Sequence, residues 1–107
     1  MNRLEEKMCA AVCARKDWKS ADKHTRVKVV SEDEVRVYFW RTCIFRIKDG
    51  VRAWSMVGPD KNGRPHIWNT RTTRSRLAAL TGIAFTVRKG VLYANGKKVE
   101  RFHNQKV

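Results

Sequence analysis

Apolar and polar side chains alternate along residues 25–57, and this pattern constrains the fold more than any other feature of the chain. A period of two residues puts every second side chain on the same face of a strand, as in a sheet with one buried face. The alternation runs through TRVKVV (25–30), VRVYFW (35–40), CIFRIK (43–48) and VRAWSMV (51–57). The connections SEDE, RT and DG are short and polar. Consecutive strands joined in this way predict an antiparallel β-meander.

Helical patterns flank the meander on both sides. Residues 3–16 place an apolar stripe on one helical face, formed by Leu4, Met8, Ala11 and Val12. Asn2 precedes this segment and is a favourable N-cap residue. A second, shorter helix is expected near residues 73–81, where Gly82 supplies a helix-ending signal.

The remaining segments predict connections and a C-terminal β-hairpin. Residues 17–24 are polar, and residues 58–65 form the longest predicted loop, with two Gly and two Pro. Residues 66–68 predict a short strand, Asn95-Gly96 is a strong hairpin turn, and residues 103–107 are expected to fray. With 107 residues, the chain is expected to form one small α+β domain.

Positive charge dominates the composition. The formal net charge is +14, and residues 61–107 contribute +10 of it, with Glu100 as their one acidic residue. A domain this basic repels itself unless a polyanion neutralises it, and Lys and Arg release counterions from phosphate chains on binding. The charge therefore favours nucleic acid or another phosphate-rich ligand as a partner, and solubility alone is the alternative explanation.

The alternation sorts the predicted strands into two faces. One set is apolar and is expected to form the core face: Val27, Val29, Val35, Val37, Phe39, Cys43, Phe45, Ile47 and Val57. The other set mixes cations with aromatic rings: Arg26, Lys28, Arg36, Tyr38, Trp40, Arg46, Lys48, Arg52 and Trp54. Such a face suits single-stranded nucleic acid, because aromatic planes stack on bases while arginines contact phosphates. Alternatively, the N-terminal helix or a partner subunit covers these aromatic residues.

Three arginines crowd the expected start of the second helix. The segment TRTTRSR contains Arg71, Thr72, Thr73, Arg74, Ser75 and Arg76. A helix N-terminus carries partial positive charge, so arginines there are unfavourable until an anion binds. Its free N–H groups, the hydroxyls of the Thr and Ser residues, and the guanidinium groups together predict a phosphate cradle. The alternative is a set of solvated arginines without a ligand.

The signals for catalysis and for metal binding are weak. The chain has no phosphate-binding glycine loop, nucleophile elbow or HExxH motif, and His24, His66 and His103 are scattered. We therefore expect no enzyme, cofactor or metal. The three cysteines Cys9, Cys13 and Cys43 are expected to be reduced structural thiols, with a zinc site that includes a histidine as the alternative.

The N-terminus lacks the apolar segment of a signal peptide, and no run approaches the roughly 20 apolar residues of a membrane span. These absences predict a cytoplasmic protein.

The segment NTRTTRSRLAAL, preceded by Trp68 and followed by the RKGVLYANGK hairpin, resembles a pattern in small proteins of tailed bacteriophages. Those proteins carry a similar Thr-Thr-x-Ser-Arg-Leu-x-Ala-Leu stretch after a Trp-containing strand. The resemblance spans Trp68 to Leu80 and carries over no catalytic residue. It implies a phage origin and action in the cytoplasm of a bacterial host.

Taken together, these patterns predict a non-enzymatic phage protein that binds nucleic acid or another phosphate-rich ligand. The expected contacts are the arginine-ringed helix start and six residues of the basic and aromatic sheet face: Arg36, Tyr38, Trp40, Arg46, Arg52 and Trp54. The alternative is an inhibitor of a host nuclease or defence complex. Such an inhibitor would act by binding the host protein or by sequestering a signalling nucleotide.

Overall fold

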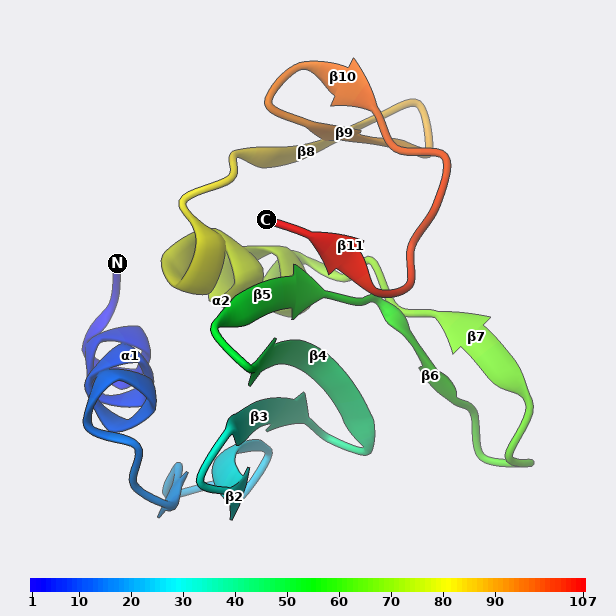
Figure 1. Ribbon diagram of the computed structural model, residues 1–107. Coiled ribbons are helices and arrows are strands. Elements are labelled where there is room, and N and C mark those ends of the chain that lie inside the picture. The colour runs from blue at the N-terminus through cyan, green and yellow to red at the C-terminus, as the bar shows by residue number, and fades with distance from the viewer.

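The computed structural model describes residues 1–107 and confirms the α+β fold class (Figure 1). The elements in chain order are α1 (Arg3–Ala14), β1 (Trp18–Lys19), β2 (Thr25–Ser31), β3 (Glu34–Phe39), β4 (Thr42–Lys48), β5 (Val51–Trp54), β6 (Val57–Pro59), β7 (Pro65–Ile67), α2 (Arg71–Thr81), β8 (Phe85–Arg88), β9 (Val91–Ala94), β10 (Lys97–Lys98) and β11 (Gln105–Lys106). Asn2 caps α1 as predicted, and its side chain and that of Glu5 form a reciprocal capping box.

The predicted meander is the main sheet, with the strand order β1-β2-β3-β4-β5-β11. The turn Asp49-Gly50 has positive φ at both residues, 52° and 78°, which suits a two-residue hairpin connection. It pairs Lys48 with Val51. A three-stranded sheet, β10-β9-β8, contains the predicted hairpin at Asn95-Gly96, and β6 pairs with β7 in a separate two-stranded hairpin.

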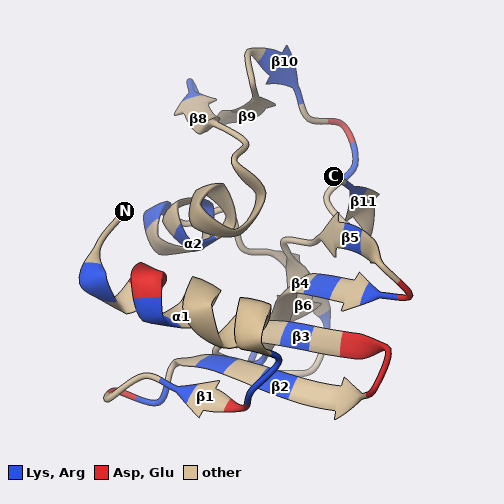
Figure 2. Cartoon of the chain, turned by 60° about the vertical axis from the view of Figure 1, so that its left-hand side comes forward, with Lys and Arg blue, Asp and Glu red and all other residues tan.

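Both helices pack against one face of the main sheet (Figures 1 and 2). Apolar side chains from α1, the strands and α2 meet there in a single core cluster. Its most deeply buried members include Met8, Val37, Phe45, Met56 and Leu77. The opposite face of β2, β3 and β4 carries no helix.

Among the boundaries that differ from the sequence prediction, four depend on long-range pairing. β1 lies in the predicted loop 17–24, where it pairs with β2. The predicted strand 51–57 is divided into β5 and β6, because the chain leaves the sheet after Trp54. The predicted loop 58–65 contributes to the β6–β7 hairpin. Residues 103–107 were expected to fray, but they contain β11, which pairs with β5.

Three residues, Cys43, Arg52 and Trp54, lie on the opposite sheet face from the one predicted; Arg52 pairs with Ile47. A register shift in the β3–β4 pairing makes Ile44 an extra residue, so Cys43 lies opposite Tyr38 on the helix-free face. Trp54 lies opposite Phe45, on the core side, and is only 4% exposed. The helix-free face therefore presents Ala53 in place of the expected tryptophan.

Candidate functional site

Helix α2 begins at Arg71, two residues earlier than predicted, and its N-cap is Thr70. The Thr70 hydroxyl accepts a hydrogen bond from the Thr73 backbone N–H at 3.3 Å and lies 3.0 Å from the Thr73 hydroxyl. Thr73 is itself buried. The hydroxyls of Thr72, Thr73 and Ser75 are therefore not the helix caps.

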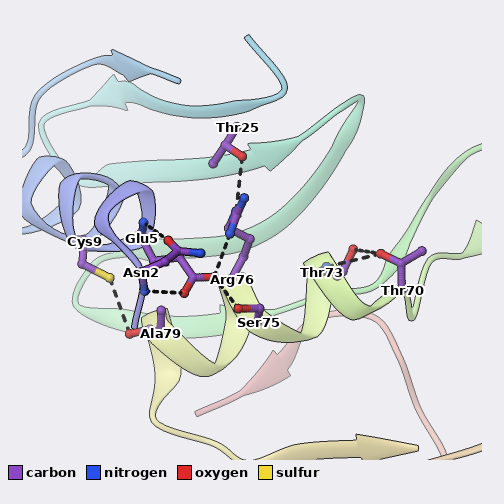
Figure 3. Close-up of polar contacts among 9 residues, drawn as sticks. All are labelled: Asn2, Glu5, Cys9, Thr25, Thr70, Thr73, Ser75, Arg76 and Ala79. Carbon is purple, nitrogen blue, oxygen red and sulfur yellow. Dashed lines mark hydrogen bonds and ion pairs between the residues drawn. The ribbon is translucent and has the colours of Figure 1, made fainter. Parts of the chain in front are cut away.

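Ser75 and Arg76 point away from the start of α2 and toward α1 (Figure 3). The Arg76 Nη1 atom lies 2.7 Å from the Glu5 Oε2 atom, and the Ser75 hydroxyl donates to the same oxygen at 2.5 Å. The Arg76 Nε atom also donates to the Thr25 hydroxyl at 3.4 Å. We call Glu5, Thr25, Ser75 and Arg76 the Glu5 clamp. It joins α1 to α2, and it directs the side chains of Ser75 and Arg76 to Glu5 rather than to the helix start where the cradle was predicted.

Burial raises the pKa of the Glu5 carboxyl, but the hydrogen bonds from Ser75, Arg76 and the Asn2 backbone N–H, together with the charge of Arg76, outweigh burial. The net effect lowers the pKa below its usual value, so Glu5 is ionised at neutral pH. The clamp explains why an arginine occurs at position 76: it neutralises a carboxylate that is 3% exposed.

Of the six residues predicted to form the cradle, Arg71, Thr72 and Arg74 lie at the start of α2 and form no hydrogen bond or ion pair with Glu5. Arg71 is exposed, and Thr72 and Arg74 are half-buried. The Arg74 Nε atom donates to the Asn69 carbonyl at 3.2 Å. No acidic residue lies in the first turn. The partial positive charge of the helix end and two guanidinium groups therefore coincide without a neutralising carboxylate.

Cations form a row across the helix-free face of the main sheet. The register places Lys28 opposite Arg36, Arg36 opposite Arg46, and both Arg46 and Lys106 opposite Ala53. Arg26 and Tyr38 form the neighbouring pair on this face. We call Arg26, Lys28, Arg36, Tyr38, Arg46 and Lys106 the cationic face. Figure 2 shows basic residues along β2, β3 and β4, while acidic residues lie in the first turn of α1, at the start of β3 and in the connections between strands.

Arg36 is the one member of the cationic face that forms an ion pair. Its Nε atom lies 2.5 Å from the Glu34 carboxylate, and its Nη1 atom donates to the Tyr38 hydroxyl at 3.4 Å. The contacts with Tyr38 and Glu34 raise the pKa of Arg36, and the hydrogen bond from Arg36 lowers the pKa of Glu34. Arg36 is thus held in position, and Lys28, Arg46 and Lys106 remain without a carboxylate partner.

A hollow of about 450 Å³ lies beside the start of α2. Three segments enclose it: residues 39–42 at the β3–β4 turn, residues 59–61 at the β6–β7 turn, and Trp68 with Thr70 and Thr73. We call it the Trp hollow, because Trp40 and Trp68 both line it. Its volume is within the roughly 300–1,000 Å³ range of small-molecule sites.

Specific contacts hold the walls of the Trp hollow in place. The Arg41 Nη2 atom donates to the Asp60 carbonyl at 2.7 Å and connects the two turns. The Trp68 Nε1 atom donates to the Gly58 carbonyl at 3.3 Å. Gly58 packs so tightly against β4 that an added Cβ would come within 2.1 Å of the Thr42 hydroxyl oxygen. The β6–β7 hairpin is therefore fixed against the sheet.

The cationic face and the Trp hollow meet at the β3–β4 turn. The Arg26 guanidinium lies 5.1 Å from the centre of the Tyr38 ring, and its Nη2 atom donates to the Trp40 carbonyl at 3.5 Å. Trp40 was predicted within a strand, but it occupies the turn with φ 56° and is 57% exposed. A ligand that crosses the cationic face beside Arg26 would reach the hollow directly.

The structure thus brings together part of the predicted site. Arg36, Tyr38 and Arg46 share one face, and Trp40 adjoins it, while Arg52 lies opposite Ile47 and is directed to the other side. The prediction omitted Trp68, although Trp68 directly precedes the arginine-rich segment, and it omitted Arg41 and Lys61. The run of turn residues at 58–65 was a signal that Trp68 follows a short surface hairpin rather than a core strand.

The cysteines and histidines are dispersed. Cys9 and Cys13 lie on α1, and Cys43 lies on the sheet. No group of three His, Cys, Asp or Glu side chains is placed to hold a metal ion. The three histidines have separate neighbours: His24 stacks on Trp40, His66 packs on Trp68, and the His103 Nδ1 atom lies 2.9 Å from the Ser55 hydroxyl.

Neither helix has the length and apolar character that a membrane crossing requires.

Comparison with known proteins gives one match, to a family model. The model is described as Kyanoviridae Gp96 protein and matches residues 1–106, which supports a tailed-phage origin. None of the curated proteins or solved structures compared with the chain matches it. Because the match spans nearly the whole sequence, the chain belongs to the Kyanoviridae Gp96 protein family.

Proposed function

We propose that this phage protein binds nucleic acid, without catalysing a reaction, through the cationic face and, beyond the β3–β4 turn, the Trp hollow with the start of α2 beside it. The observation that carries this proposal is the lack of internal neutralisation. Of the 24 Lys and Arg side chains, Arg36 and Arg76 alone form ion pairs with carboxylates. A phosphate chain would supply the missing negative charge.

The cationic row gives the proposal a location. Like charges directly opposite each other in a sheet are destabilising, by a few tenths of a kcal/mol or more. Lys28, Arg36 and Arg46 nevertheless line up on adjacent strands. Glu34 compensates one of them, and the others gain a counterion when an anion binds. The sheet therefore keeps an unfavourable alignment that a phosphate chain would make favourable.

The dimensions of the row suit an extended polyanion. From β2 to β11 the row crosses five strands, a distance of about 19 Å at a strand spacing of roughly 4.8 Å. That length matches about five to six base pairs of B-DNA on the basis of its roughly 3.4 Å rise. Several phosphates therefore lie within reach of the row at once.

A salt titration with paired charge variants tests the proposal. The variant Lys28→Gln with Arg46→Gln removes two cations of the cationic face, and Lys97→Gln with Lys98→Gln removes two exposed cations from β10 in the other sheet. We expect the first variant to bind a single-stranded oligonucleotide at least tenfold more weakly, and its slope of log K against log salt to be about 1.4 shallower. The second variant should bind nearly as the parent does. Melting curves establish that both variants are folded.

Two outcomes would contradict the proposal. Equal losses in the two variants would mean that binding follows net charge and not the cationic face. An affinity that does not fall with salt would mean that phosphate contacts are absent. A host protein that stays bound after nuclease treatment, with no nucleic-acid binding by the purified chain, would favour an inhibitor of a host nuclease or defence complex.

A further inference from the structure

We propose that the Trp hollow binds one unpaired base of a nucleic-acid strand, so that the protein prefers single strands to duplex. This inference rests on the proposed function and adds the strand form of the ligand. It follows from three features of the hollow: its aromatic walls, the conformation of Trp40, and the charges around its rim.

The aromatic walls provide stacking surfaces for a flat ring. Trp40 and Trp68 both line the hollow and come from different segments, one from the β3–β4 turn and one from the segment before α2. His24 stacks on Trp40 with ring centres 3.6 Å apart and planes 21° apart. Because His24 covers one face of the indole, the other face is the one available to a ligand. Stacking on such a surface tolerates every base, since each base has a π-face.

The conformation of Trp40 is costly for the folded chain. Its φ of 56° lies in the left-handed region, where bulky residues are uncommon, and 57% of its surface is exposed. A glycine or an asparagine would occupy this turn position with less strain and would expose less apolar surface. A base stacked on the indole would cover that surface.

The charges around the hollow suit the phosphates on either side of the base. Arg41 and Lys61 lie at the rim, and Arg71 and Arg74 lie at the adjoining start of α2. Asp60 is the one carboxylate among the lining residues, and its Oδ1 atom already accepts hydrogen bonds from the Asn62 and Arg64 backbone N–H groups. A single strand with one unstacked base could place the neutral base in the hollow and its flanking phosphates beside the cations at the rim.

A duplex cannot use this site without losing its own stacking. Its bases are paired and stacked inside the double helix, and a base must be unstacked before it can enter a protein pocket. The cationic face contacts phosphates in both forms. The hollow therefore adds affinity for single strands alone, and this addition depends little on salt because stacking releases few counterions.

The variant Trp40→Asn tests this inference, because asparagine tolerates a left-handed backbone. Its matched control is Val51→Asn, which removes a similarly exposed apolar side chain (49%) at the β4–β5 turn, outside the hollow. The probes are an oligothymidine of about 12 nucleotides, within the roughly 4–16 nucleotides typical of single-strand sites, and a duplex of equal length. Thymidine monophosphate serves as the free nucleotide.

We expect the parent protein to bind the single strand more tightly than the duplex at equal salt, with quenching of tryptophan fluorescence. Trp40→Asn should weaken single-strand binding roughly 5- to 100-fold and leave duplex binding unchanged. Val51→Asn should match the parent, and Trp40→Asn should melt at the same temperature or higher.

Three results would overturn the inference while the proposed function stands: unchanged binding by Trp40→Asn, equal losses for single strand and duplex, or a monophosphate that binds as tightly as the oligonucleotide. If neither strand form binds the parent protein, the proposed function itself is wrong.

Discussion

Replacing Arg76 with Met removes the cation that neutralises a buried carboxylate. The Glu5 side chain is 3% exposed and the Arg76 side chain 11%, with 2.7 Å between Nη1 and Oε2. Removing one partner of such a buried pair costs about 3–5 kcal/mol, because the remaining charge is left uncompensated. The whole domain is expected to have a free energy of unfolding of about 5–15 kcal/mol. We therefore expect Arg76→Met to lower the melting temperature by about 12–20 °C.

The pH dependence of this loss follows from the pKa of Glu5. In the parent protein the pKa is lowered, so Glu5 contributes stability above its unfolded value, near 4.5, and loses it as the pH falls through the folded value. Without Arg76, Glu5 loses one hydrogen bond and one favourable charge while burial still acts on it, so its pKa is higher in the variant than in the parent and less of this stabilisation remains at neutral pH. The stability difference between parent and variant should be largest at neutral pH and narrow toward pH 3.

Urea unfolding at several pH values, followed by tryptophan fluorescence, measures both effects. Arg74→Met is the matched control, since Arg74 lies on the same helix and forms no ion pair. The double variant Glu5→Met with Arg76→Met should recover at least half of the loss, because an apolar pair of similar volume avoids the buried charge. A variant Arg76→Met that unfolds within about 0.5 kcal/mol of the parent, or a difference that does not change with pH, would refute a structural role for the clamp.

Two further predictions concern the C-terminal strand and the thiols. Deleting residues 103–107 should lower the free energy of unfolding by at least about 1 kcal/mol. The reason is that β11 pairs with β5 and the Val107 backbone N–H donates to the Arg52 carbonyl. An unchanged urea midpoint would mean that the segment frays. Iodoacetamide should alkylate the exposed Cys13 before Cys9 and Cys43, as measured by mass spectrometry. Burial raises the pKa of the Cys9 and Cys43 thiols and so makes them less reactive. Preferential labelling of Cys43 would contradict its placement on the sheet.

The local pattern predicted most elements because local chemistry controls them. The alternation of residues 25–48 gave β2, β3 and β4, and Asn2 and Gly82 marked the ends of α1 and α2. The position of Trp54 was also open to prediction. A two-residue turn at Asp49-Gly50 requires Lys48 to pair with Val51 and hence Phe45 with Trp54. Assigning the strand faces without that register placed Trp54 on the wrong side.

Sequence periodicity could not predict contacts between distant segments. Arg76 resembled a member of an anion cradle because its partner, Glu5, is 71 residues away. The Trp hollow combines three separate segments, and Trp40 reached it through a turn at the end of a strand pattern. The meander, the two helices, the hairpin turns and the excess of positive charge could be predicted, since they depend on neighbouring residues and composition. Which arginines are neutralised and which aromatic residues stay exposed could not be predicted, because both depend on packing between elements far apart in the chain.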